Sequence, residues 1–406
     1  MDVSDLRVAL FSGNYNYVRD GANQALNRLV GYLMRNGARV RVYSPKTGKP
    51  AFASTGKVVG IPAIPLPGRG EYRLPLGIPP KVQRDLSEFD ANIFHVASPE
   101  FLGHRAVTLA RAWSKPVVAS VHTRFETYPR YYGFAFLEPV VEAVLRRFYR
   151  RCDAIFAPSE SMAQLLREQR MSYDVGIWTR GVDTDIFRPA RRDLAWRRAQ
   201  GIPDDEPVIG FIGRLVMEKG LDVFAETIDL LARRGVRARV LVVGEGPARA
   251  WFESRLPANA VFAGFQRGED LGRAIASADM LFNPSVTETF GNVTLEAMAS
   301  GLPVVAAQAT GSLSLIEDGI NGRLIRPGAN EAFAQALRVY CEDPGARRAA
   351  GEAGLQVSAR YAWDQVNQAL VDGYLRVIRL RSAGIRPISK ARGGPSRQPL
   401  RARLRG

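Results

Sequence analysis

The stretch NPSVTETFGNVTLEAMASG, residues 283–301, decides the fold that we expect for this chain. It continues the apolar run ADMLFN (278–283), which has the length of a buried strand, and Pro284 ends that run. After a polar turn, the stretch becomes an amphipathic helix near Gly291 or Asn292. It therefore predicts a strand, a polar loop and a helix, the repeating unit of a parallel α/β sheet.

Two acidic residues, Glu288 and Glu296, bracket the start of this helix, in the loop and in the second turn respectively. The N–H groups of Gly291, Asn292 and Val293 have no partner within the helix, and such helix starts bind anions, phosphate above all. An anion held between carboxylates that accept hydroxyl hydrogen bonds is what a sugar nucleotide requires. Taken alone, two glutamates beside a helix are usually a solvated face, so the interpretation depends on the rest of the chain.

The same strand–helix alternation extends through the chain in two successive series. We predict a doubly wound parallel sheet from each series, giving an α/β chain of two Rossmann-like domains that face a cleft. The main apolar runs of the first series are 7–11, 40–44, 91–98, 116–122, 153–159 and 174–178, and those of the second are 207–213, 237–244, 259–264, 278–283 and 303–307.

The domain boundaries follow from the restart of the pattern. We expect a first domain over 1–185, a second over 186–360, a helix over 361–380 and a disordered basic tail over 381–406. The helix carries an apolar stripe of Trp363, Val366, Leu370 and Tyr374.

Composition narrows the class of protein. The 406 residues are 46% hydrophobic and 24% charged, with two cysteines, so we expect a soluble globular protein without a disulfide framework. A signal peptide and a long apolar run are not evident, which predicts a cytoplasmic location. The formal net charge is +16, half of it in the tail. A basic chain suits phosphorylated substrates or an anionic membrane surface; without a recognisable motif, nucleic acid is not an expected partner.

Polar features follow other predicted strands. Gly13 and Gly21 lie in the loop SGNYNYVRDGAN (12–23), where glycine lets the backbone approach a phosphate or sugar, although a tight turn explains them equally well. The loop lacks the GxGxxG pattern of dinucleotide binding. His122 ends a central strand at the cleft, a better position than that of most single histidines, which are usually structural.

The loop GRLVMEKG (213–220) follows the first strand of the second domain. Arg214 and Lys219 are placed there to grip a pyrophosphate, the alternative being ordinary surface charges. The stretches GEGPARAW (244–251) and AGFQRGEDL (263–271) end the next two strands, where they could cup a nucleobase. No Cys/His cluster has zinc-binding spacing, so we expect no essential metal.

To about residue 380 the chain resembles glycosyltransferase family 4, retaining enzymes with the two-domain GT-B fold. The motifs that carry the resemblance are GVDTDIF (181–187), GRLVMEKG (213–220), ETFGNVTLE (288–296), ASGLPVVA (299–306) and EDGING (317–322). Two departures stand out, because the family often has Gly-Gly pairs where this chain has Asp20-Gly21-Ala22 and Thr310-Gly311-Ser312.

The resemblance implies a role for each site residue. Arg214 and Lys219 would neutralise the donor diphosphate, while Glu288 would bind hydroxyls of the transferred sugar. Glu296 would bind the ribose. The amides of Phe290 and Gly291 would lie near the sugar, Gly21 near the phosphates, and His122 near the donor sugar. The first domain would bind the acceptor.

The resemblance is strongest to α-mannosyltransferases that use GDP-mannose and to their sulfolipid-forming relatives. It implies a metal-independent hexosyltransferase, with no cofactor beyond the nucleotide-sugar donor, acting on a lipid or glycan acceptor. Because no carboxylate is clearly placed behind the sugar as a nucleophile, we expect front-face attack with retention, the leaving phosphate accepting the proton. The alternatives are a UDP-sugar-dependent transferase of glycolipid synthesis and an epimerase of similar plan; a dinucleotide oxidoreductase is disfavoured.

One segment bears on membrane binding. RRFYRRC (146–152) lies on an expected helix with Leu137, Val141 and Leu145. This helix could rest on the anionic inner face of the plasma membrane, although a solvated arginine face explains it slightly better.

Overall fold

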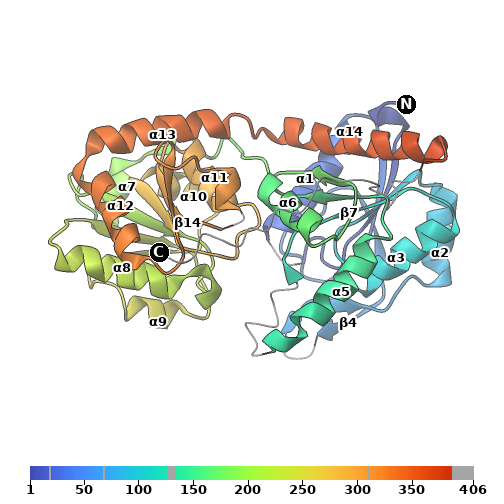
Figure 1. Ribbon diagram of the computed structural model, residues 1–406, viewed down its shortest axis with the longest axis horizontal. Helices are drawn as coiled ribbons and strands as arrows, with labels where there is room; N and C mark the ends of the chain where they lie inside the picture. Colours follow the sequence, from blue (N-terminus) through green and yellow to red (C-terminus); the bar gives the residue numbers. More distant parts are fainter. Residues whose placement is uncertain (18–19, 67–68, 126–133, 310, 386–406) are drawn as a thin grey trace, which may run out of the picture.

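The computed structural model describes residues 1–17, 20–66, 69–125, 134–309 and 311–385. These residues form two α/β domains that lie side by side, each built on its own parallel sheet (Figure 1). The predicted fold class is confirmed. Most of the predicted basic tail lies outside the described residues, from 386 onward.

The first sheet has seven parallel strands. Side chains alternate between its faces: Val8 and Leu10 point to one side, and Ala9 and Phe11 to the other. Helices α1 (Gly21–Arg35) and α14 (Trp363–Ser382) cover the first face, and α2 (Pro80–Phe89), α3 (Phe101–Ala112), α5 (Glu138–Tyr149) and α6 (Glu160–Glu168) the second. The strand order is β3 (Lys57–Ile61), β2 (Arg39–Pro45), β1 (Arg7–Phe11), β6 (Ile93–Val96), β7 (Val117–Ser120), β8 (Ala154–Ala157) and β9 (Val175–Ile177).

The second sheet has six parallel strands with the same winding. Their order is β12 (Val261–Gly264), β11 (Arg239–Val243), β10 (Val208–Ile212), β13 (Met280–Asn283), β14 (Val304–Ala307) and β15 (Gly322–Ile325). One face is covered by α8 (Leu221–Arg233), α9 (Arg249–Glu253) and α12 (Asn330–Glu342), and the other by α10 (Gly268–Ala276) and α11 (Asn292–Ala299), against which α13 (Pro344–Ser358) packs. A short helix, α7 (Leu194–Ala199), precedes the sheet.

The strand order of each sheet reverses direction at one point, between β1 and β6 in the first and between β10 and β13 in the second. Loops that leave neighbouring strands on opposite sides of such a point open a crevice at the carboxyl edge, where ligands of these folds bind. The fold thus brings together the loops after β10 and β13, which carry the predicted donor residues.

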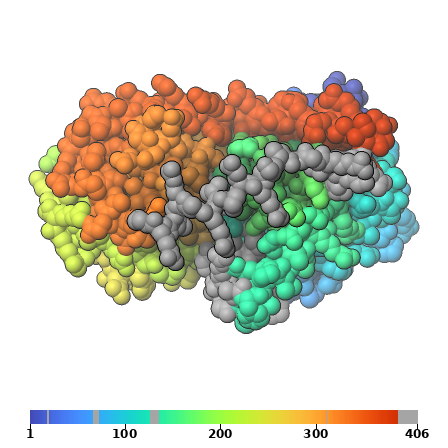
Figure 2. Space-filling model, viewed as in Figure 1, coloured from blue at the N-terminus to red at the C-terminus, as the bar shows by residue number. Residues whose placement is uncertain are grey.

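The chain crosses between the domains twice, and the two crossings lie together. The Val182 N–H donates to the Tyr361 carbonyl oxygen at 2.9 Å, and Val182 forms a parallel bridge with Ala362. Helix α14 then lies along the first domain, as Figures 1 and 2 show in red. It buries Val366, Leu370 and Tyr374 of the predicted stripe. The helix ends at Ser382, so Arg381 and Ser382 are helical and not part of the predicted tail.

Three features differ from the sequence interpretation. The sequence did not predict the edge strand β3 or the antiparallel strands β4 (Ala63–Leu66) and β5 (Arg69–Pro75) in the Pro-rich passage. Prolines are tolerated there because these strands have a free edge. The prediction that Leu137, Val141 and Leu145 share a membrane-facing side of α5 was wrong in part. Leu145 is 7% exposed and packs with Val141 on the core, because α5 has to cover the sheet.

Candidate active site

The start of α11 has the geometry predicted from the sequence. The helix begins at Asn292, and Gly291 caps it with φ of +96°, a left-handed conformation that favours glycine. Glu288 therefore lies in the preceding loop and Glu296 in the second turn. The first turn follows β13 at the carboxyl edge of the sheet, where ligands of such folds bind, and its N–H groups have no partner within the helix.

Lys219 and Glu288 meet at this point. The Lys219 Nζ atom donates to Glu288 Oε1 at 2.6 Å, with side-chain exposures of 30% and 18%. Their loops are packed tightly: a Cβ on Gly220, whose φ is +73°, would lie 3.1 Å from the Pro284 carbonyl oxygen. The structure therefore holds a cation and a carboxylate against each other at a helix N-terminus, where an entering diphosphate would compete for the ammonium group.

Arg214 lies in the same loop, at the carboxyl end of β10, but is exposed and makes no ion pair within the described part of the chain. Its loop is joined to the loops that follow the next two strands. The Leu215 N–H donates to the Glu245 carbonyl oxygen at 3.0 Å, and the Gly244 N–H to that of Gly264 at 2.8 Å. The stretches predicted to cup a nucleobase thus form one rim with the Arg214 loop.

Glu296 lies partly buried on α11, in the second turn. Burial raises the pKa of its carboxyl group to about 8, and the neighbouring charge of Glu288 acts in the same direction. Near neutral pH the group therefore holds a proton much of the time, unlike an ordinary glutamate.

Gly21 lies across the domain boundary from the start of α11. A Cβ at Gly21, the first residue of α1, would lie 2.2 Å from Asn292 Nδ2. The starts of α1 and α11 therefore face each other directly, with the Asn292 side chain in the space that a larger residue at 21 would need. The Asn292 Oδ1 atom is buried and has no hydrogen-bond partner among the described residues.

Gly13 has a neighbour that the sequence did not reveal. A Cβ at Gly13 would lie 1.8 Å from Glu100 Oε1, so the Glu100 carboxylate fills the space beside this glycine. Ser98 Oγ donates to the same oxygen at 2.8 Å, and burial raises the pKa of Glu100. A residue larger than glycine at position 13 would collide with the Glu100 carboxylate, which lies at the switch point of the first sheet. Glu100 follows a strand end, the criterion that singled out His122, and could have been found by it.

The His122 ring is held by protein groups on both sides. Its Nδ1 atom lies 2.6 Å from Arg180 Nη2 and its Nε2 atom 2.9 Å from Ser120 Oγ. The His122 carbonyl oxygen accepts a hydrogen bond from Thr289 Oγ1 of the second domain at 3.1 Å. His122 therefore contacts the residue after Glu288 through its main chain, while both ring nitrogens are engaged elsewhere.

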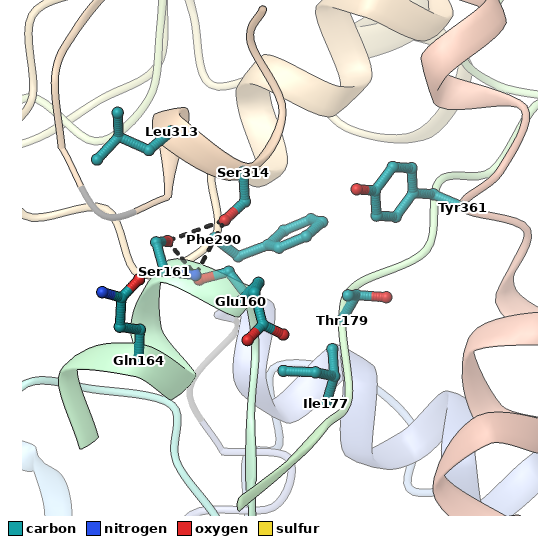
Figure 3. Close-up of a pocket in the computed structure, with 10 residues that line it drawn as sticks. Glu160, Ser161, Gln164, Ile177, Thr179, Phe290, Leu313, Ser314 and Tyr361 are labelled. Atoms are coloured by element: carbon teal, nitrogen blue, oxygen red, sulfur yellow. Dashed lines mark hydrogen bonds between the residues drawn. The ribbon is translucent and has the colours of Figure 1, made fainter. Parts of the chain in front are cut away.

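A cavity of about 510 Å³ lies between the domains near this loop (Figure 3). The Phe290 ring points into it, and the hydroxyl groups of Ser161 and Ser314 meet across the boundary at 2.8 Å. Neither Lys219 nor Glu288 lines this cavity. The ten lining residues are Ser159, Glu160, Ser161, Gln164, Ile177, Thr179, Phe290, Leu313, Ser314 and Tyr361.

The described residues lack both a metal-binding cluster and a membrane-spanning helix. They contain no group of three or more His, Cys, Asp or Glu side chains placed to hold a metal ion. None of their helices combines the length and apolar character needed to span a bilayer.

Family models match both halves of the chain. Residues 19–186 match the model described as Glycosyltransferase Family 4, and residues 206–343 match Glycosyl transferases group 1. A GDP-mannose-dependent alpha-mannosyltransferase of Mycolicibacterium smegmatis is 32% identical over 93% of this chain and 99% of its own. The sulfoquinovosyl transferase SQD2 of Arabidopsis thaliana is 31% identical over 88% of this chain and 71% of its own.

Solved structures share the two-domain architecture. Sucrose-phosphate synthase of Thermosynechococcus elongatus superposes with a TM-score of 0.76 at 19% identity, covering 92% of this chain and 99% of its own. HepE of Anabaena, solved with UDP and glucose, gives 0.68 at 19% identity, covering 91% and 99%. At this identity the likeness establishes the fold, which is GT-B.

Proposed function

The chain belongs to glycosyltransferase family 4, and from this membership we propose that it is a retaining hexosyltransferase that moves α-mannose from GDP-mannose to a lipid or glycan acceptor. The observation that carries the proposal is the Lys219–Glu288 pair at the N-terminus of α11. The bond to be broken joins a diphosphate to a sugar: the Lys219 cation suits the diphosphate, and the Glu288 carboxylate suits the sugar hydroxyls.

The proposed mechanism follows the charges. Cleavage of the bond between sugar and diphosphate leaves negative charge on the phosphate and builds positive charge on the ring. Lys219, Arg214 and the first-turn N–H groups of α11 would stabilise the former without a metal. The Glu288 carboxylate would separate from Lys219 and accept hydrogen bonds from hydroxyl groups of the sugar instead. The acceptor would then attack from the face that the leaving group vacates, and the phosphate would take its proton.

The donor is proposed from relatives. Three mannosyltransferases described as GDP-mannose-dependent match between 80% and 93% of this chain. A second candidate, a UDP-sugar-dependent transferase of glycolipid synthesis, is favoured by the similarity to the sulfoquinovosyl transferase over 88% of the chain. In either case Glu296 would bind the ribose and the rim beside Arg214 the base.

A lipid acceptor is favoured by one surface. Three large apolar side chains on or just before α5 lie open: Phe136 is 73%, Val140 59% and Val144 52% exposed. Arginines around them fold back on the protein; Arg146, for example, donates to Glu142 and to the Gln169 carbonyl oxygen. We propose that these apolar side chains enter the interface of an anionic membrane, with the enzyme bound peripherally.

The test is transfer from labelled GDP-mannose, UDP-glucose and UDP-sulfoquinovose to a lipid extract, with the anomeric configuration of the product read by NMR. We expect an α-linked product from GDP-mannose, and Glu288→Gln should lower its rate of formation by about 10²–10³. A β-linked product would refute retention. Interconversion of the sugar nucleotide without an acceptor would identify an epimerase instead.

A further inference from the structure

A chain of hydrogen bonds, buried at its first two links and part-buried at its last two, runs from the C-terminal helix to the interdomain connection beside the site. It joins five side chains: Tyr374 on α14, His95 on β6, Ser120 on β7, His122 just after β7, and Arg180 after β9. In that order, the successive donor–acceptor distances are 2.5, 2.8, 2.9 and 2.6 Å.

Arg180, at one end of this chain, is a cation without a carboxylate partner among the described residues. It is 5% exposed, and its Nη1 atom donates to the carbonyl oxygens of Trp178 and Thr179, each at 3.0 Å. Its guanidinium group lies 5.0 Å from the centre of the Trp178 ring. Burial lowers its pKa to about 10, with Asp20 opposing the shift, so it stays charged at neutral pH.

A guanidinium group has only donors, and this fixes the direction of every bond in the chain. His122 Nδ1 must accept from Arg180, which leaves the ring proton on Nε2 to be donated to Ser120. The Ser120 hydroxyl then donates to His95 Nε2, and His95 Nδ1–H donates to the Tyr374 oxygen. One cation thus selects the tautomers of two histidines.

We propose that Arg180 is a positioning residue for glycosyl transfer, holding His122 as the neutral Nε2–H tautomer and thereby anchoring the loop that carries Glu288. The loop is tied to this histidine at Thr289, the neighbour of Glu288. Thr289 Oγ1 donates to the His122 carbonyl oxygen at 3.1 Å, and Ser159 Oγ donates to the Thr289 carbonyl oxygen at 2.9 Å. His122 and Ser159 both belong to the first domain. The position of the Glu288 carboxylate, which belongs to the second domain, therefore depends on groups across the domain boundary.

The charges around His122 keep it neutral. Burial, the charge of Arg180 and the neighbouring His95 all lower its pKa, and burial lowers the pKa of His95 to about 3. Tyr374 stays protonated because burial raises its pKa. Asp20 interacts with Arg180, whose charge opposes the rise of the Asp20 pKa caused by burial. Removing Arg180 takes away one repelling charge and frees Nδ1, while burial, the larger cause of the lowered pKa of His122, remains. The neutral ring then no longer has to carry its proton on Nε2.

The test begins with the intact protein, because it has only three histidines. Long-range ¹H–¹⁵N spectra of histidine-labelled protein, assigned with His→Gln variants, report tautomer and protonation directly. We expect neutral Nε2–H for His122 from pH 6 to 8, unchanged in Arg180→Lys, which keeps a cation and a donor. In Arg180→Met, where Nδ1 has lost its donor, the Nδ1–H form of neutral His122 should appear beside the Nε2–H form. Tyr374→Phe, the matched control at the far end, should alter the His95 signals alone.

Kinetics then test the positioning role, which rests on the proposed function. Arg180→Met should lower kcat at least tenfold with the donor KM within threefold, and Arg180→Lys should recover part of the lost kcat. An imidazolium or Nδ1–H form of His122 in the wild type overturns the proposal, as does unchanged kcat in Arg180→Met. If the wild type transfers no sugar while its His122 is Nε2–H, the proposed function fails and the tautomer assignment stands.

Discussion

Gly311→Ala tests how closely the loop that carries Glu288 is held. The Gly311 N–H donates to the Glu288 carbonyl oxygen at 2.8 Å, and its φ of −70° is open to any residue, so alanine brings no backbone strain. The added Cβ would lie 2.6 to 2.8 Å from the carbonyl carbon, oxygen and nitrogen of Phe290. Carbon contacts settle near 3.5 Å, so the loop has to move by roughly 0.9 Å.

A displacement of this size should lower the catalytic rate strongly and the free energy of unfolding only moderately. A shift of about 1 Å at a reacting centre costs about 10²-fold in rate, equivalent to about 2.7 kcal/mol of activation free energy. Overpacking of this kind costs about 1–3 kcal/mol of stability, which lowers Tm by roughly 2–12 °C in a domain of this size. We therefore expect kcat to fall about 100-fold in a protein that remains folded.

The assay is transfer of labelled sugar at saturating donor, with Tm measured on the same samples. Gly48→Ala is the matched control, since its Cβ would meet nothing within 4 Å, and it should keep wild-type kcat. A Gly311→Ala enzyme with kcat within twofold of wild type would refute the reasoning, because the loop would then tolerate the shift without loss.

Three further predictions concern the same crevice. Lys219→Ala and Glu288→Gln should each lower kcat by about 10²–10³ without unfolding the protein, as circular dichroism can check; near-normal turnover in either would remove that residue from the site. The raised pKa of Glu296 means that the folded state binds an extra proton between about pH 4.5 and 8. The free energy of unfolding of the wild type therefore falls as the pH rises through that range. Glu296→Gln lacks this loss, and its Tm relative to wild type should rise from pH 5 to pH 9; a constant difference would contradict the shift. Gly21→Ala should slow transfer by blocking the approach of the domains, and Asn292→Ala in the same chain should restore it; a lack of rescue would place the clash elsewhere.

The sequence predicted the contacts that follow from topology. Lys219 and Glu288 are 69 positions apart, yet both follow strands that flank the switch point of one sheet, so alternation and loop position were enough to bring them together. The first residue of α11 could also be predicted from the sequence, because Gly291 ends a polar loop and the helical residues follow it directly.

What the sequence could not supply was the bonding of particular side chains. The position of His122 at the cleft was predicted, but its hydrogen bonds depend on Arg180, 58 positions away in a connection that becomes buried only when the domains and α14 pack. The inward side of α5 was misjudged for a similar reason: Val141, Leu145 and Val144 are all apolar, and only packing decides which of them faces the core.

The central claim, that the donor diphosphate binds between Lys219 and the start of α11, is tested most directly by calorimetric titration of GDP. We expect GDP to bind the wild type more tightly than UDP or ADP, and Lys219→Ala to weaken it at least tenfold, or about 1.4 kcal/mol. Lys57→Ala, an exposed lysine on the edge strand β3, should leave the affinity unchanged. Equal GDP affinities in wild type and Lys219→Ala would contradict the account.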